Sequence, residues 1–315
     1  SVVVEGARSQ SVAAESGVPP GTELGPLLFL LYINDLPECV SSQVRLFADD
    51  CLIYRVINSA ADQLALQWDL IALEQWCQVW GMRFNTSKCE IMRIHRGHDT
   101  RSHMYTLDGE VLREVSRAKY LGLTITDNLT WSYHISSAAA KANSKIGFFW
   151  RNLRHCPLEL RERAYFSLVR SVIEYSSSVW DPHLKKDVQL LESVQRRAAR
   201  FVKCDSQRTS SVSAMLQDLG WESLEDRRRY IRLSLFFKAV HGLNAIDTSN
   251  TLVKADERTR SRHPYKFRHI PGKTNTYRQS FFPRTVPQWN ALPAEAVMPA
   301  APALASSEPP GLDYP

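Results

Sequence analysis

The chain has 315 residues, a net charge of +6 and 44% apolar residues, so its length predicts about two domains with packed cores. No Cys-x-x-Cys pair occurs among its six cysteines, which argues against a disulfide framework and against a zinc ribbon. No cleavable signal peptide is visible, so we expect an intracellular protein, nuclear or cytoplasmic, and not a secreted one.

The first recognisable element is a Gly/Pro-rich loop that leads into an apolar segment. Thr22 is a suitable N-cap and Pro26 suits a first helical turn, so residues 27–33 are predicted to form a helix buried on most of its circumference. The apolar run from Leu24 to Ile33 is half the roughly 20 residues that a membrane span needs. We therefore expect no membrane partner.

Two adjacent carboxylates, Asp49 and Asp50, lie between two short apolar runs in residues 44–54, which predicts a β-hairpin with the aspartates at its turn. Hard cations such as Mg²⁺ prefer carboxylate oxygens and complete their coordination with water and substrate phosphates. Such a hairpin suits phosphoryl or nucleotidyl transfer. The other interpretation is an ordinary turn, because aspartate is a common turn former.

The rest of the chain predicts a mixed segment followed by helices. Residues 61–80 have apolar side chains near helical spacing, residues 89–94 resemble a strand, and residues 116–126 resemble a hairpin strand followed by an Asp127-Asn128 turn. Helices are expected near 132–153, 158–175, 187–203 and 222–240. The third has an apolar stripe formed by Val188, Leu191, Val194, Ala198, Phe201 and Val202. Residues 244–280 are expected to be loop, and the Pro/Ala-rich tail from 294 to be disordered.

Charge is distributed unevenly along the chain. Residues 1–80 hold 3 Lys/Arg against 10 Asp/Glu, whereas residues 131–240 hold 19 against 11, a balance of +8. A basic helical region beside an acidic metal site suits a protein that binds nucleic acid, because neutralised phosphates supply most sequence-independent affinity. The candidate phosphate contacts are Arg196, Arg197, Arg200, Arg227, Arg228 and Arg229. Tryptophans could stack on bases, but core packing is the more common role.

Several segments together resemble one family. Residues 17–36 read Gly-Val-Pro-Pro-Gly-Thr-Glu-Leu-Gly-Pro-Leu-Leu-Phe-Leu-Leu-Tyr-Ile-Asn-Asp-Leu, and Phe-Ala-Asp-Asp follows at 47–50. Further segments are Trp-Cys-Gln-Val-Trp-Gly-Met-Arg-Phe-Asn-Thr-Ser-Lys at 76–88, Tyr-Leu-Gly-Leu-Thr-Ile at 120–125, Ser-Val-Trp-Asp-Pro at 178–182, Gln-Arg-Arg-Ala-Ala-Arg-Phe-Val at 195–202 and Ser-Phe-Phe-Pro-Arg-Thr-Val-Pro-Gln-Trp-Asn-Ala-Leu-Pro at 280–293. This combination resembles the reverse transcriptases of non-LTR retrotransposons over nearly the whole chain.

The resemblance implies a role for each matching position. Asp49 and Asp50 match the metal-binding pair of the polymerase palm, which uses two Mg²⁺ or Mn²⁺ ions in the complete enzyme. Phe47 would pack beneath the pair, and Lys88 resembles the palm lysine that acts on the departing pyrophosphate. The primer grip would be formed by Tyr120, Leu121 and Gly122. The nucleotide and template loop would be formed by Gly17, Val18, Pro19, Pro20, Gly21, Leu24 and Gly25.

The chain also departs from the family pattern. A further palm aspartate is expected upstream of Ser1, and Asp35 is expected to be structural, so we expect the chain by itself not to polymerise DNA. Pro20 stands where the family usually has glutamine, which removes an amide side chain and a main-chain donor, and Glu23 adds negative charge near the phosphates.

The resulting prediction is an α+β chain: a partial palm with an antiparallel sheet and helices over residues 1–127, a helical thumb over 128–243 and a C-terminal extension over 244–315. Its partners would be an RNA template, a DNA primer and deoxynucleotides, and no obligate protein partner can be inferred. The alternatives are a non-catalytic nucleic-acid-binding remnant or domesticated fragment, and a self-splicing-intron maturase. The Trp-Asp-Pro and Gln-Arg-Arg-Ala-Ala-Arg-Phe segments favour the retrotransposon family over the maturase.

Overall fold

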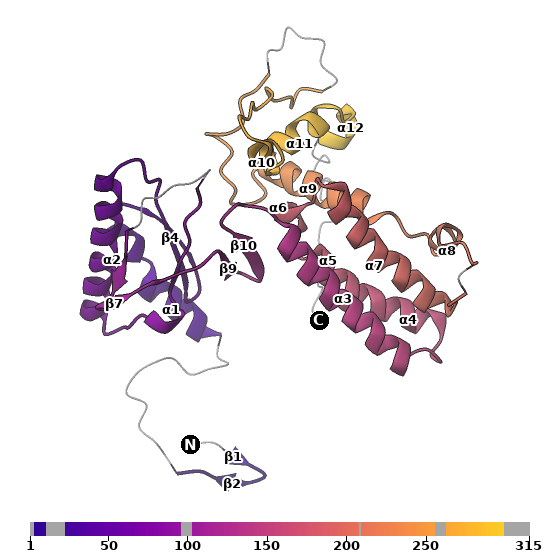
Figure 1. The fold of residues 1–315 in the computed structure, drawn as a ribbon, viewed down its shortest axis with the longest axis horizontal. Coiled ribbons are helices and arrows are strands. Elements are labelled where there is room, and N and C mark those ends of the chain that lie inside the picture. The colour runs from indigo at the N-terminus through magenta and orange to yellow at the C-terminus, as the bar shows by residue number, and fades with distance from the viewer. Residues whose placement is uncertain (1–2, 11–22, 96–102, 208, 256–262, 299–315) are drawn as a thin grey trace, which may run out of the picture. The chain divides into compact units, whose positions relative to one another are not determined.

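The computed structural model describes residues 3–10, 23–95, 103–207, 209–255 and 263–298, and the chain divides into two compact units (Figure 1). The first unit covers residues 1–118 and the second covers residues 119–315. The first mixes short strands with helices and the second is mostly helical, which confirms the α+β prediction. Among the described residues, no helix is both long enough and apolar enough to cross a bilayer.

The first unit is built from a long helix and several short strand pairs. Its helices are α1 (Leu24–Ile33), η1 (Leu36–Cys39), α2 (Ala60–Trp80) and η2 (Thr86–Lys88). Antiparallel pairs form between β1 (Val3–Val4) and β2 (Ala7–Arg8), β3 (Gln43–Phe47) and β4 (Asp50–Tyr54), and β6 (Thr106–Leu107) and β7 (Glu110–Val111). The strand expected at 89–94 is shorter, since β5 (Glu90–Ile91) pairs in parallel with β8 (Arg113–Glu114) over two residues.

Helix α2 organises the core of this unit. It begins at a capping box in which Ser59 and Asp62 satisfy each other's backbone N–H groups, and it ends where Gly81 adopts a left-handed conformation. Its buried face includes Leu70, Leu73 and Trp76, which pack with residues of η1, β3 and β6. The helix confirms the prediction for residues 61–80.

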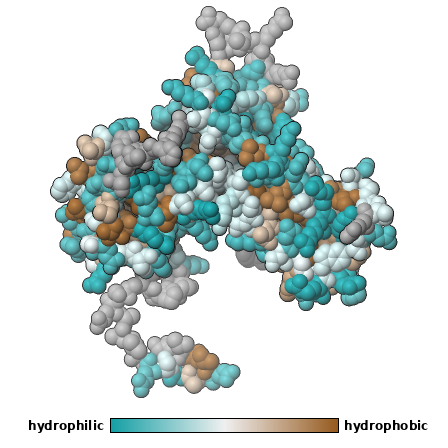
Figure 2. Space-filling view, in the orientation of Figure 1, coloured by the Kyte–Doolittle hydropathy of each residue, from teal (hydrophilic) through white to brown (hydrophobic). Residues whose placement is uncertain are grey.

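Much apolar surface of the first unit stays exposed, and Figure 2 shows hydrophobic side chains among its surface residues. The prediction that residues 27–33 form a helix buried on most sides is wrong about the burial. In α1 only Gly25 and Ile33 are buried, while Leu27, Leu28 and Leu31 are at least half exposed. The helix N-cap is Glu23, whose side chain makes no capping bond. Thr22 lies outside the described residues.

The second unit begins with a strand pair and continues as helices. Strand β9 (Arg117–Tyr120) starts at the end of the first unit and pairs with β10 (Leu123–Thr126), and residues 127–128 turn as expected. The helices are α3 (Ser132–Asn152), α4 (Leu158–Ala164), the π-helix η3 (Tyr165–Arg170), α5 (Ser171–Glu174), α6 (Ser177–Trp180), α7 (Lys185–Lys203), α8 (Val212–Asp218) and α9 (Leu224–Val240). The four helices predicted from residue 132 to 240 are therefore confirmed.

The core of the second unit lies where α3 and α7 run alongside each other (Figure 1). Every residue of the predicted α7 stripe is buried except Val188, which is half-buried. Ile135, Ala142 and Ile146 of α3 face this stripe and are fully buried. The division between the units falls nine residues before the predicted boundary at 127, because Leu123 of β10 packs into this helical core.

The C-terminal part contains more helix than the sequence predicts. Helices α10 (Asn275–Arg278), α11 (Phe281–Asn290) and α12 (Ala294–Val297) come after the described residues 241–255 and 263–274, which contain no helix. Phe236 of α9 packs with Val286, Trp289 and Val297 in a separate hydrophobic cluster. The expectation of disorder from residue 294 is wrong for Ala294–Val297, because Val297 is fully buried. Residues 299–315 lie outside the described part.

Candidate active site

Asp49 and Asp50 lie at the tip of the β3–β4 hairpin. Phe47 pairs with Asp50, so Ala48 and Asp49 form a two-residue turn and both carboxylates are exposed. Ala48 adopts a φ of 50°, a left-handed conformation that a residue with a Cβ rarely takes. Phe47 is 62% exposed, so the expectation that it packs beneath the pair is wrong. The hairpin presents two adjacent carboxylates to solvent, where a hard cation with its waters or a phosphate could reach them.

The described residues contain no cluster of three or more acidic, histidine or cysteine side chains that could hold a metal ion. Lys88 is exposed at the end of η2 and forms no ion pair with either aspartate in the described structure. Asp35 accepts a hydrogen bond from Trp76 Nε1 at 3.1 Å. It therefore has the structural role that the sequence predicts. The metal site that this hairpin can offer is a pair of carboxylates.

Asp69 of α2 holds the base of the hairpin and was not recognised from the sequence. Its carboxylate accepts hydrogen bonds from the backbone N–H groups of Ser41 (2.8 Å) and Ser42 (2.9 Å), and Arg55 lies 3.6 Å away. Burial raises the pKa of the Asp69 carboxyl, but the hydrogen bonds from both serines lower it by more, so the pKa lies below the usual 3.8. The chain leading into β3 is thereby fixed to α2.

We expect Asp69→Asn to destabilise the first unit by about 1–3 kcal/mol at neutral pH, because two backbone donors lose a charged acceptor. A lowered folded-state pKa gives stabilisation that is complete above the unfolded pKa and is lost as the pH falls through the folded pKa. The difference between the wild type and the variant should therefore shrink below pH 3.8. Urea unfolding between about pH 2 and 7 measures it. A difference that does not change with pH would contradict this role.

The nucleotide and template loop is only partly visible. Gly17, Val18, Pro19, Pro20 and Gly21 lie outside the described residues. Leu24 and Gly25 form the first turn of α1, where Leu24 is exposed and Gly25 is buried. Only these two of the seven predicted loop residues are placed by the structure.

The predicted primer-grip residues form a tight hairpin turn between β9 and β10. Leu121 has a φ of 46° and Gly122 a φ of 81°, the conformation expected of a two-residue turn that matches strand twist. Tyr175, which follows α5, donates a hydrogen bond from its hydroxyl to Leu121 O at 3.1 Å. A Cβ on Gly122 would lie 3.2 Å from Tyr175 Cε1. Sequence reasoning missed Tyr175, because its partner lies 54 residues earlier in the chain.

We expect Gly122→Ala to destabilise the second unit by about 1–2 kcal/mol, because an L-residue is strained at this φ and its methyl group presses on the Tyr175 ring. Gly147→Ala is the matched control, since Gly147 is helical and its nearest atom to a Cβ lies 3.8 Å away. The control should be neutral or stabilising. Thermal unfolding of both variants measures the difference, and an equal loss in both would refute this account.

The six arginines proposed to contact phosphate fall into three groups. Arg196, Arg197 and Arg229 are exposed. Arg200 donates to Gln207 O at 2.6 Å, and Arg227 forms an ion pair with Glu174 through two of its nitrogens. The side chain of Arg228 is only 1% exposed, so phosphate cannot reach it, and this part of the prediction is not consistent with the structure.

Asp181 of the Trp-Asp-Pro segment explains the burial of Arg228. Its carboxylate accepts from Arg228 Nε at 3.0 Å, pairs with Arg232 and lies 3.4 Å from Arg284 Nη2. Arg284 also donates to Asp181 O at 2.7 Å, which ties α11 to the end of α6. The only sequence signal for this cluster was the Trp-Asp-Pro segment itself. Trp180 beside it is fully buried, as is Trp289, which confirms core packing for these two tryptophans.

A model of the reverse transcriptase (RNA-dependent DNA polymerase) family matches residues 2–125. Over these residues the chain is similar to the reverse transcriptase family. The matched region contains both aspartates of the hairpin tip, Lys88 and the predicted primer grip. It ends within β10, so the helices of the second unit lie beyond the reverse transcriptase segment.

Curated proteins of Drosophila mobile elements resemble the chain more widely. The RNA-directed DNA polymerase from mobile element jockey of Drosophila melanogaster is 26% identical over 287 residues, which cover 86% of this chain and 31% of that protein. The probable RNA-directed DNA polymerase from transposon X-element of the same species is 26% identical over 198 residues, 59% of this chain and 22% of the relative. The jockey polymerase of Drosophila funebris is 29% identical over 157 residues, 46% of this chain and 17% of the relative.

The chain thus spans about a third or less of the length of these relatives. The similarity to the Drosophila melanogaster jockey polymerase nevertheless extends well beyond the reverse transcriptase segment, because 287 aligned residues must include most of the helical unit. No solved structure matches the chain significantly.

Proposed function

We propose that the chain supplies the catalytic aspartates and the thumb of an RNA-directed DNA polymerase of the non-LTR retrotransposon type. The observation that carries this proposal is the exposed Asp49–Asp50 pair at the tip of a two-residue hairpin, within a segment that is similar to the reverse transcriptase family. The substrates would be an RNA template, a DNA primer 3′ end and deoxynucleoside triphosphates. The resemblance to the jockey and X-element polymerases supports this choice of substrates.

Asp49 and Asp50 would hold Mg²⁺ or Mn²⁺ through their carboxylates, with Asp49 as the stronger candidate for direct ligation. Divalent ions bound there would lower the pKa of the primer 3′ hydroxyl and neutralise the pyrophosphate as it leaves. The exposure of both side chains leaves room for water and substrate phosphates, which Mg²⁺ usually retains as ligands. Lys88 would act on the leaving pyrophosphate, and the turn formed by Tyr120, Leu121 and Gly122 would hold the primer strand.

Two carboxylates alone make a weak site for two ions, and the described residues bring no third acidic group to them. The test is primer extension on an RNA template with Mg²⁺, run for this chain and for a longer protein that contains this chain. We expect extension by the longer protein and its loss in Asp49→Ala. Nucleic-acid binding without extension in every protein tested would instead indicate a non-catalytic remnant.

We expect Arg196→Gln combined with Arg197→Gln to weaken nucleic-acid binding, because both side chains are exposed on α7 and can contact phosphate. Each lost contact should reduce the slope of log affinity against log salt by about 1, and the pair should reduce it by about 2. Fluorescence anisotropy across a salt series measures the slope. The control pair Arg8→Gln and Arg83→Gln removes the same charge from exposed positions of the first unit. Equal salt slopes for the two double variants would contradict phosphate binding by Arg196 and Arg197 of α7.

A further inference from the structure

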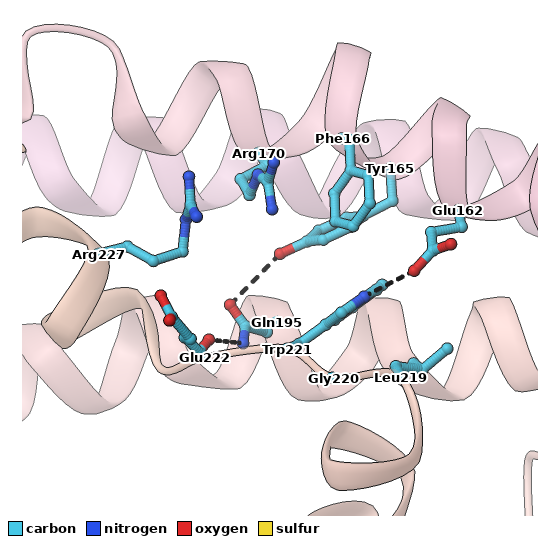
Figure 3. Close-up of a pocket in the computed structure, with 10 residues that line it drawn as sticks. All are labelled: Glu162, Tyr165, Phe166, Arg170, Gln195, Leu219, Gly220, Trp221, Glu222 and Arg227. Atoms are coloured by element: carbon cyan, nitrogen blue, oxygen red, sulfur yellow. Dashed lines mark hydrogen bonds between the residues drawn. The ribbon is translucent and has the colours of Figure 1, made fainter.

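A cavity of about 350 Å³ lies within the second unit (Figure 3). Its walls come from α4 and the π-helix η3, from α7, from the α8–α9 connection and from α9. The lining residues are Glu162, Tyr165, Phe166, Arg170, Gln195, Leu219, Gly220, Trp221, Glu222 and Arg227. A cavity of this size can enclose a small planar ligand, since ligand pockets typically measure about 300–1,000 Å³.

The π-helix decides which side chains reach the cavity. Residues Tyr165–Arg170 form this element in the middle of the helix that spans α4 to α5. A π-helix turn costs regular hydrogen bonding and occurs often at functional sites. Here it turns Tyr165, Phe166 and Arg170 toward the cavity together.

One end of the cavity is aromatic. The rings of Tyr165 and Trp221 stack with centroids 4.3 Å apart and planes 16° apart, and Phe166 lies 5.5 Å from Trp221. Trp221 is fixed by a hydrogen bond from its Nε1 to Glu162 at 2.8 Å. This end forms a rigid apolar wall of the kind that binds flat rings.

The other end carries donors and acceptors that the protein does not fully use. Figure 3 shows the guanidinium group of Arg227 and the carboxylate of Glu222 at this end. The guanidinium group of Arg170 lies between the two ends, over the Phe166 ring at 3.9 Å from its centroid. Arg227 binds Glu174 through Nε and Nη2, and no hydrogen bond from its Nη1 is found among the described residues. Arg170 Nε lies 3.7 Å from Glu174. Gln195 Oε1 has only a long contact of 3.4 Å with the Tyr165 hydroxyl.

Charge decides between an anionic and a neutral ligand. Arg170 and Arg227 contribute two positive charges, while Glu162, Glu222 and the paired Glu174 contribute three negative ones. A site that is slightly negative overall does not favour a phosphate. A neutral ring that both accepts from arginine and donates to carboxylate fits better.

We propose that this cavity binds an unpaired guanine base. Guanine offers O6 and N7 as paired acceptors for an arginine fork, and its N1–H and N2–H groups are paired donors for a carboxylate such as Glu222. Its flat ring suits the aromatic wall, and single-stranded RNA is commonly recognised by such stacking and edge contacts. The inference deepens the proposed function, on which it rests, by adding a guanine preference to template binding. A free guanine nucleoside would be bound by the same groups.

The test uses the whole chain and labelled oligouridine RNAs of about five nucleotides that carry guanine, adenine, inosine or 7-deazaguanine at the centre. We expect the central guanine to bind about tenfold tighter than adenine, because each paired contact discriminates by about that factor or more. Inosine lacks the N2 donors and 7-deazaguanine lacks the N7 acceptor, so both should bind more weakly than guanine. Competition with free guanosine distinguishes two kinds of site. Displacement of the RNA by guanosine would indicate a nucleoside site, and no displacement would indicate a site that needs the RNA chain.

Glu222→Gln keeps the shape of the side chain and removes its charge. It should abolish the preference for guanine over inosine, whereas Glu159→Gln, at an exposed position of α4 outside the cavity, should preserve it. Binding of all four RNAs with equal affinity would overturn the guanine site, and the salt slope and primer extension would still report on the proposed function. Loss of extension with the guanine preference intact would instead contradict the polymerase and leave the guanine site standing.

Discussion

Asp181→Asn is expected to destabilise the second unit by about 3–5 kcal/mol, which is a large part of the stability of a typical domain. The wild-type carboxylate faces Arg228, Arg232 and Arg284, and the first two side chains are almost completely buried. Neutralising the carboxylate that contacts both arginines in the described structure leaves their buried guanidinium charge less compensated. Arg228 Nη1 and Nη2 already have no hydrogen-bond partner among the described residues, so Arg228 has few other contacts that could offset the lost charge of Asp181. Urea unfolding followed by circular dichroism measures the loss.

The matched control is Asp218→Asn, which removes the same charge from an exposed ion pair with Lys203. Surface pairs of this kind contribute about 0–1 kcal/mol, because solvent screens them and both side chains lose rotamer freedom. The control variant should therefore unfold nearly at the wild-type urea concentration. Equal losses in the two variants would show that the Asp181 cluster adds nothing beyond an ordinary surface pair.

The arginines of α9 show where sequence reasoning stops. Consecutive helical residues point about 100° apart, so Arg227, Arg228 and Arg229 cannot share one environment. Arg227 pairs with Glu174, Arg228 is buried against Asp181 and Arg229 is exposed. The sequence predicted the helix itself correctly. It could not reveal which arginine faces inward, because both acidic partners come from residues about 50 positions earlier.

Helices α7 and α1 differ in how well their sequences predict which side chains are buried. The α7 stripe predicted burial correctly, because its polar and apolar residues alternate with helical period. Helix α1 is apolar on all sides, so its sequence indicates no preferred face, and most of its leucines are exposed. Composition alone therefore overestimated its burial.

Helix α11 was not predicted from the sequence, and it contains two prolines. Pro283 lies in the first turn, where a backbone N–H has no helical partner in any case, and Pro287 lies inside the helix. Such a pattern normally predicts a loop. Packing of Val286 and Trp289 against Phe236 compensates for the lost hydrogen bond, and that contact depends on tertiary structure. The hairpin with Asp49 and Asp50, by contrast, is a local structure, and it forms between the two apolar runs as the sequence predicts.

Asp49→Asn is expected to reduce the primer-extension rate of the longer protein by at least about 100-fold, because metal-assisted charge stabilisation contributes several kcal/mol to such transition states. The amide is nearly the same size, and the side chain is exposed and makes no hydrogen bond among the described residues, so folding should be unaffected. The affinity for a template and primer duplex should also change little, because that affinity comes mainly from phosphate contacts. A loss confined to the rate would separate metal binding from nucleic-acid binding.

Asp35→Asn provides the control for this comparison. Asp35 accepts the Trp76 Nε1 hydrogen bond, so its replacement should lower stability modestly and leave the extension rate of the folded protein within a few-fold. Titration with Mg²⁺ and Mn²⁺ adds a second measurement, since loss of a ligand should raise the metal concentration needed for half-maximal rate. If the Asp49→Asn protein extended primers as fast as the wild type at the same metal concentration, the hairpin tip would have no role in catalysis.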